Sequence, residues 1–181
     1  MTSQPIPSPS SAVTNAQNVL LVIDAESVLT GYPDPSADAA NPTSITDEFI
    51  FIITAANSKK IATNDSNVTL TVEIDRDLHF RSRSISLIAE HSVAVYNMTT
   101  DDSAVLSEPK LEVHQDLTVP APDHTNPTVP ASHRADDHFW VCTPKTFGTA
   151  QCALNFMLVN QQCEAVGYFR CQVAVELRPQ R

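Results

Sequence analysis

The sequence is poor in glycine and lacks the motifs that depend on it. Its 181 residues include three glycines, and Gly31, Gly148 and Gly167 are too far apart to form a phosphate-cradling loop. The nucleophile motif Gly-x-Ser-x-Gly is also missing. We therefore predict that the protein is not an enzyme and uses no cofactor.

Basic residues are also scarce, and their scarcity excludes two classes of partner. Eleven Lys and Arg residues stand against 21 Asp and Glu residues, for a net charge of −10. Such a chain repels phosphate backbones and anionic membrane surfaces, so we expect neither nucleic acid nor membrane as a partner. No apolar run reaches the roughly 18 residues that span a bilayer. The N-terminus lacks a basic region followed by an apolar run, so we expect a cytoplasmic protein, with signal-independent secretion left open.

The four cysteines do not form a metal-binding pattern. Cys142, Cys152, Cys163 and Cys171 include no Cys-x-x-Cys pair, which argues against a structural zinc site. Cys152 and Cys171 share the apolar parity of their predicted strands, as small buried hydrophobic residues do. A disulfide between adjacent C-terminal strands is the alternative, and it would need an oxidising compartment.

The residues that are abundant favour strands. Val68, Leu70, Val72 and Ile74 alternate with polar residues, the period of a half-exposed strand, and 19–23 is a continuous apolar run. We predict an all-β protein, an antiparallel β-sandwich of the immunoglobulin-like type, in one domain over residues 17–181 after a disordered tail at 1–16. About eight strands are expected. Residues 84–89 and 92–98 form either one bent strand or a pair. The predicted strands lie at 18–24, 49–54, 68–75, 84–89, 92–98, 105–119, 138–143, 152–158 and 164–177. No amphipathic helix is predicted beyond one helical turn at 36–40.

Two long proline-rich loops are predicted to connect these strands. The first loop follows the strand at 18–24 and contains Pro33, Pro35 and Pro42. The second loop covers 120–137 and contains Pro120, Pro122, Pro127 and Pro130. Proline fixes φ and withholds an N–H, so these loops should be stiff. Each could cover a sheet edge or bind a ligand. We expect Tyr32 and its neighbouring prolines to pack the first loop over the first strand.

Possible ligand-binding groups gather in the second loop and next to it. The densest set comprises His133, Asp136, Asp137 and His138. Imidazole and carboxylate groups can bind a divalent ion, but this spacing matches no known ligand pattern, so no metal site is predicted. Candidate residues for binding a glycan or another small ligand are Tyr32, Asp34, His133, Asp136, Asp137, His138 and Trp140. Core packing is the alternative role for the aromatic residues among them.

The segment 105–119 alternates weakly and is expected to form an exposed edge strand. An edge must be paired, covered or charged, so a second subunit could pair with it. We therefore expect a homo-oligomer.

The first loop carries a distinctive pattern. The strand ends in Ile23-Asp24, and Tyr-Pro-x-Pro-Ser-x-Asp at 32–38 and Asn-Pro-Thr at 41–43 follow. This pattern resembles the N-terminal signature of the AidA/PixA family of bacterial inclusion-body proteins. Gly167, Tyr168 and Phe169 resemble the Gly-Tyr-Phe step in the family's last hairpin.

The resemblance implies quorum-regulated expression, dense cytoplasmic inclusions and no enzymatic activity. It offers no catalytic residues to carry over. Our leading interpretation is a non-enzymatic, self-associating, inclusion-body-type protein, quorum- or stress-linked and host-interacting. The rival is a lectin-like binding module for carbohydrate or another small ligand that uses the proline-rich loops.

Overall fold

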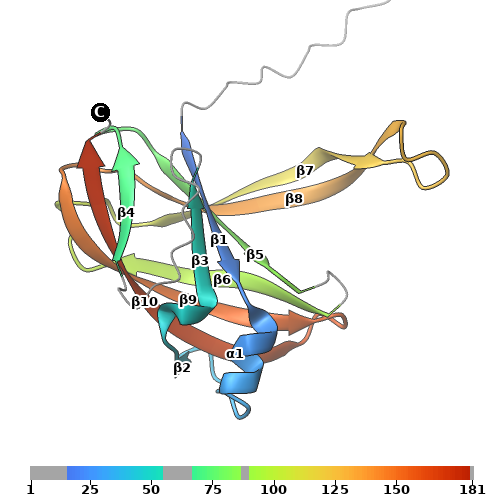
Figure 1. The fold of residues 1–181 in the computed structure, drawn as a ribbon, viewed down its shortest axis with the longest axis horizontal. Coiled ribbons are helices and arrows are strands. Elements are labelled where there is room, and N and C mark those ends of the chain that lie inside the picture. The colour runs from blue at the N-terminus through green and yellow to red at the C-terminus, as the bar shows by residue number, and fades with distance from the viewer. Residues whose placement is uncertain (1–15, 55–66, 87–89, 180–181) are drawn as a thin grey trace, which may run out of the picture.

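Two five-stranded sheets face each other in the computed structural model, which describes residues 16–54, 67–86 and 90–179. Sheet A has the order β3 (Ile50–Thr54), β1 (Gln17–Ile23), β5 (Leu78–Ser84), β8 (Pro130–Cys142) and β7 (Lys110–Pro122). Sheet B has the order β2 (Thr43–Ser44), β10 (Ala165–Pro179), β9 (Gly148–Asn160) and β6 (His91–Thr100), and β4 (Asn67–Val72) also pairs with β10. Figure 1 shows the β7–β8 hairpin extending well beyond the rest of the molecule.

The predicted all-β sandwich is confirmed, but its sheets are mixed rather than purely antiparallel. β1 pairs in parallel with β5, and β10 pairs in parallel with both β2 and β4. β2 and β4 use different stretches of the same strand, opposite 169–170 and 174–179 of β10. One long strand therefore pairs with two short ones on the same side.

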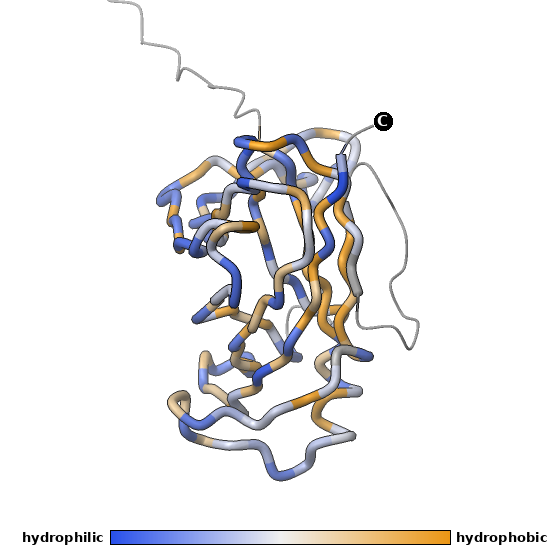
Figure 2. Tube along the Cα trace, turned by 90° about the vertical axis from the view of Figure 1, so that its left-hand side faces the viewer, coloured by the Kyte–Doolittle hydropathy of each residue, from blue (hydrophilic) through white to orange (hydrophobic). Residues whose placement is uncertain are grey.

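The core lies between the sheets and follows the predicted parity. In β9 and β10 the buried side chains occur at every second position, as expected for strands with one face inward. Phe156 and Phe169 stack there with ring centroids 5.5 Å apart. Hydrophobic stretches follow these strands in Figure 2. Trp140 joins the two sheets, because its indole N–H donates to the carbonyl of Val95 in β6 at 3.0 Å.

A short helix, α1 (Ala25–Gly31), follows β1 where a loop was predicted. The carboxylate of Asp24 caps it by accepting from the backbone N–H of Ser27 at 3.1 Å. Ala25 and Val28 are fully buried on its inner face. A 3-10 helix, η1 (Asp47–Phe49), precedes β3. The helical turn predicted at 36–40 does not form.

Two other predictions of local structure were wrong. Of the strand predicted at 84–89, Ser84 ends β5, residues 85 and 86 lie outside any strand, and 87–89 lie outside the described residues. β5 itself was missed, because its polar residues at positions 79, 81 and 83 hid it. The loop predicted at 120–137 is mostly the end of β7 and nearly all of β8. Both faces of this hairpin are largely exposed, so it has none of the apolar parity that marks a half-buried strand. Its prolines at 120, 122 and 130 fall near the end of the ladder, where proline is tolerated.

The turn predicted at 160–162 joins β9 to β10 as expected. The predicted tail at 1–16 lies outside the described residues except for Ala16. Among the residues that the structure describes, no helix is long and apolar enough to cross a membrane.

Candidate functional site

The first proline-rich stretch, residues 32–44, is packed against sheet B, and we call it the docked loop. The backbone N–H of Tyr168 in β10 donates to the carbonyl of Ser36 at 2.9 Å. The hydroxyl of Tyr96 in β6 donates to the carbonyl of Ala39 at 2.9 Å. Within the loop, the N–H of Ser36 donates to the Thr43 hydroxyl at 2.8 Å. The docked loop is therefore held at several points.

A close approach of the Pro35 ring to the backbone of Gly167 fixes where the docked loop lies. A Cβ atom added to Gly167 would come within 2.6 Å of the ring of Pro35. Side-chain atoms do not approach that closely, so glycine is required at this position. The two stretches that resemble the AidA/PixA pattern are therefore in direct contact with each other.

Tyr32 begins the docked loop and is half-buried against the core. Its ring meets the ring of Phe49 edge-on, with centroids 6.2 Å apart, and its hydroxyl accepts from the N–H of Thr46 at 3.4 Å. Asp34 is exposed. The contacts of Tyr32 agree with the packing role expected for it, although the partner is Phe49 of η1.

The helix that leads into the docked loop is tied to β6 through Glu26. Its carboxylate lies 2.6 Å from Nδ1 of His91 and accepts from the hydroxyl of Ser86 at 3.1 Å. The hydrogen bond from His91 holds the pKa of Glu26 below its usual range. Helix α1 is thus held by polar contacts to β6 and to the segment after β5, in addition to the burial of Ala25 and Val28.

The root of the β7–β8 hairpin is built around Phe139, which is buried although it lies on the outer face of sheet A. The imidazole of His79 stacks on its ring at 4.6 Å, and His114 meets the ring edge-on at 5.0 Å. The guanidinium of Arg81 lies 4.4 Å above the ring, a cation–π contact. Three polar side chains therefore cover one aromatic ring.

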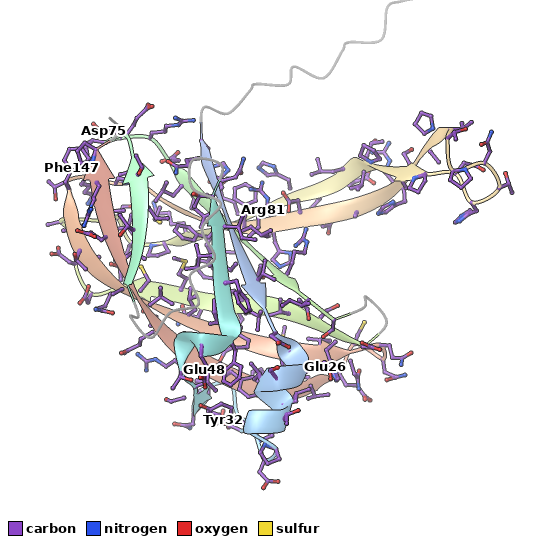
Figure 3. All side chains as sticks on the ribbon, viewed as in Figure 1. Glu26, Tyr32, Glu48, Asp75, Arg81 and Phe147 are labelled. Atoms are coloured by element: carbon purple, nitrogen blue, oxygen red, sulfur yellow. The ribbon has the colours of Figure 1, made fainter. Side chains whose placement is uncertain are left out.

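Arg81 ties this root to two other strands. Its guanidinium pairs with the carboxylate of Asp137 in β8 at 3.0 Å and donates to the side chain of Asn18 in β1 at 2.7 Å. Burial, with the charge of Arg81 as a second cause, lowers the pKa of His79. This imidazole is therefore held neutral and packs as an aromatic ring. Figure 3 shows Arg81 at the hairpin root, far from Tyr32.

The strand separates the four His and Asp residues that the sequence grouped as possible metal ligands. Successive residues of β8 point to opposite faces, so His133 and Asp137 lie on one face and Asp136 and His138 on the other. Asp136 accepts from the N–H of Asp116 at 2.8 Å. Among the described residues, no three His, Cys, Asp or Glu side chains are placed to hold a metal ion.

Trp140, the last candidate residue, lies in the core rather than on a surface, with 9% of its area exposed. Three of the cysteines, at 142, 152 and 171, are also buried, and Cys163 is exposed. Burial raises the pKa of Cys152 to about 12. Its thiol is therefore protonated at neutral pH and is no nucleophile.

The hairpin tip is an ordered polar turn. One carboxylate oxygen of Asp123 accepts from the N–H groups of Thr125 and Asn126 and from the Thr125 hydroxyl, at 2.6–2.9 Å. These bonds, led by the one from the hydroxyl, lower the pKa of Asp123. The tip therefore holds its shape without contacting the rest of the sandwich (Figure 1).

β7 leaves apolar side chains in solvent. Leu111 and Val113 are 48% and 49% exposed, and every residue from 110 to 118 is exposed. Among the described residues β7 is the last strand of sheet A, so one of its edges has no neighbouring strand there. The prediction that 105–119 contains an exposed edge strand is confirmed.

Sequence reasoning missed the cluster at the hairpin root. His79 and Arg81 come from β5, which the sequence pattern missed, and no spacing within the chain links them to Phe139 in the strand predicted at 138–143. The one available signal was the alternation of His79, Arg81 and Arg83 with Leu78, Phe80 and Ser82, which is strand-like.

Comparisons with known proteins identify relatives of this chain. The family model for PixA, described as an inclusion body protein, matches residues 15–177. The crystal structure of the inclusion body protein PixA from Burkholderia cenocepacia J2315 is similar, with a TM-score of 0.73 and 17% sequence identity over 95% of this chain and 100% of that chain. A solution structure of Amebosin covers 76% of this chain and all of its own, with a TM-score of 0.24 and 10% identity. The search of curated proteins gave no match.

Proposed function

The chain belongs to the PixA family of inclusion body proteins, and from this premise we propose that it is a non-enzymatic protein that self-associates and is stored at high density in the cytoplasm. The observation that carries the proposal is the match of the family model over nearly the whole chain. The expected links to quorum sensing, stress and host interaction come from the same family and remain part of the proposal.

Two physical features support self-association. The free edge of β7 offers unpaired backbone donors and acceptors, which a second copy can satisfy. The net charge of −10 opposes unlimited growth at neutral pH through self-repulsion. Protonating carboxylates removes that repulsion and leaves the edge and the apolar contacts in place. Assembly should therefore grow as pH falls.

Light scattering at fixed protein concentration tests this proposal. We expect a small oligomer at neutral pH and a rise in mean particle mass as pH approaches the sequence isoelectric point of about 4.8. High salt at neutral pH is the control, because it screens the same repulsion without protonating any group. A monomer under all of these conditions would contradict both self-association and the storage role.

The alternative is a lectin-like module, which the preformed polar turns favour. Asp123 orders the hairpin tip, and Asp38 orders the docked loop by accepting from Ala40 N–H and the Asn41 amide at 2.9 and 2.7 Å. Preformed turns lose little entropy on binding. The tip and the docked loop lie at separate ends of the molecule (Figure 1), so a ligand would use one of them. A glycan array, with Asp123→Ala and Asp38→Ala as separate variants, tests this alternative.

A further inference from the structure

We propose that β7 is the surface through which two copies of the chain join, by antiparallel pairing of this strand with itself across a two-fold axis at Leu111. The inference rests on the self-association proposed above and names the surface and the register responsible. The occupant of the free edge is therefore a second copy of the same chain.

The first argument is the exposed edge itself. β7 is bonded to β8 along one side, from Lys110 opposite Val141 to Pro122 opposite Pro130. In the part of the chain that the structure describes, no strand lies on its other side. At the start of β7 the neighbouring strand β8 is itself bordered by β5, which pairs with residues 140–142. Pairing two copies through this part of β7 therefore joins their A sheets edge to edge.

The second argument is the amphipathic pattern at the start of this strand. His114 contacts Phe139 on the outer face of sheet A, and Glu112 lies opposite Phe139 in the ladder, so the even-numbered residues face outward. Leu111 lies opposite Trp140, which points into the core, so the odd-numbered residues lie on the inner face. One face of the edge is apolar and the other is charged.

The third argument is that the charged row is complementary to itself. Within β7, Lys110, Glu112 and His114 lie on the charged face, and Glu108 precedes the strand. In an antiparallel pair centred on Leu111, Lys110 lies opposite Glu112 of the second copy, and Glu108 would approach His114 just beyond the last ladder pair. Because of the two-fold axis, each of these charge pairs occurs twice in the dimer. Opposite charges directly across a ladder stabilise it, and like charges destabilise it.

The apolar face is complementary in the same register. Leu111 lies opposite its own copy at the axis, and Val113 lies opposite Pro109 of the second copy. Directly opposed side chains are within contact distance in an antiparallel ladder. Leu111 and Val113 of each copy would thus be covered by side chains of the other copy.

The ends of the paired stretch are also defined. The ladder with β8 is irregular between His114 and Leu117, and Asp116 has a φ of 54°. Such a bulge bends the edge away from a continuing partner. At the other end, Pro109 has no N–H to donate. Because the pairing is two-fold and isologous, it closes on a dimer instead of continuing into a fibre.

Sedimentation velocity on the full chain and on charge variants tests the pairing. Lys110→Glu places like charges opposite each other at two positions and should weaken the dimer about tenfold or more. The double variant Lys110→Glu with Glu112→Lys restores opposite charges in the register centred on Leu111 and should recover the dimer. Arg170→Glu, an equal charge change on an exposed residue of β10, should leave the dimer unchanged. Circular dichroism confirms that each variant is folded.

A cysteine at the axis gives an independent readout. Leu111→Cys, in a Cys163→Ser background, should form an intermolecular disulfide under mild oxidation, because directly opposed residues lie within disulfide range. Val113→Cys in the same background is the control, since its opposite residue is Pro109, and it should not cross-link.

The results separate this inference from the function on which it rests. A wild-type chain that associates while Lys110→Glu associates equally well would overturn the β7 pairing and leave self-association standing. A double variant that stays dissociated, or equal cross-linking at 111 and 113, would also overturn it. A wild-type monomer at every concentration would overturn both proposals.

Discussion

The docked loop and the β7–β8 hairpin have similar sequences and opposite structures. The docked loop and the 120–137 part of the hairpin are both rich in proline and in short polar residues, and both stretches were predicted as stiff loops. The docked loop is held on sheet B by bonds to Tyr168 and Tyr96 and by the contact of Pro35 with Gly167. In the hairpin, β7 and β8 pair with each other and extend into solvent. Proline content therefore does not decide how a segment folds; what its backbone can pair with does.

This comparison predicts that substitutions in the docked loop lower the stability of the fold and that those near the hairpin tip do not. The largest effect is expected for Tyr32→Ala. Removing the ring leaves a cavity beside Phe49 and should lower the free energy of unfolding by about 2–4 kcal/mol in urea titrations. Tyr32→Phe, which loses only the 3.4 Å bond from Thr46, is the control and should cost less. A melting curve for Tyr32→Ala that matches the wild type would assign this residue to binding instead of packing.

Gly167→Ala should have the next largest effect. Its Cβ would overlap the ring of Pro35, and relieving such an overlap costs about 1–3 kcal/mol of unfolding free energy. Pro35→Gly removes the opposing atoms, so the double variant should lose less stability than the sum of the two single variants. Strict additivity would show that this contact does not hold the docked loop in place.

A smaller, pH-dependent effect is expected for Glu26→Gln. The folded-state pKa of Glu26 is lowered by His91, so its carboxylate stabilises the fold above the ordinary Glu pKa. That contribution is lost as pH falls through the folded-state value. At neutral pH the substitution should cost less than about 1 kcal/mol, since the pair is solvent-exposed.

The pH dependence of this cost provides the check. The difference between the wild type and Glu26→Gln should shrink when unfolding is measured in acid. Glu90→Gln, at an exposed position, should show no such pH dependence. A difference that grows on acidification would reverse the assigned sign.

The smallest effect is expected in the hairpin, for Val129→Ser near its tip. Val129 is 46% exposed, and substitutions at such positions usually change stability by no more than about 0.5 kcal/mol. The measurement belongs at low protein concentration, where association adds little. A loss as large as that of Tyr32→Ala would break the comparison, because it would mean that the hairpin tip is packed against something.

The sequence predicted those parts of the fold whose strands have one buried face. The parity of β9 and β10 was readable, because burial on one side imposes a period of two. β1 was readable from its continuous apolar run, and β7 from its weak alternation. Residues 130–137 of β8 were not readable, because both faces of the strand meet solvent there and Ser132, His133 and Arg134 show no period; the end of β8 was predicted, as the strand at 138–143. Helix α1 was missed because it is short and lies beside prolines.

The candidate site was less predictable than the fold. His133 and Asp137 were grouped with Asp136 and His138 by their closeness in sequence, but a strand places neighbours on opposite faces. The contact of Pro35 with Gly167 joins residues far apart in the chain, and local patterns carry no information about such a pair. The glycine itself was the available sign, since it interrupts an otherwise apolar strand.

The position of Trp140 gives the protein a built-in optical reporter. It is the single tryptophan of the chain, it lies where the hairpin enters the core, and its indole N–H is bonded to the opposite sheet. Its fluorescence should therefore be blue-shifted in the native state and move to longer wavelength when the two sheets separate. Because the indole is buried and the hairpin tip lies far from it, events at the tip should leave the spectrum unchanged. One emission band thus distinguishes opening of the sandwich from changes at the end of the hairpin, without a label.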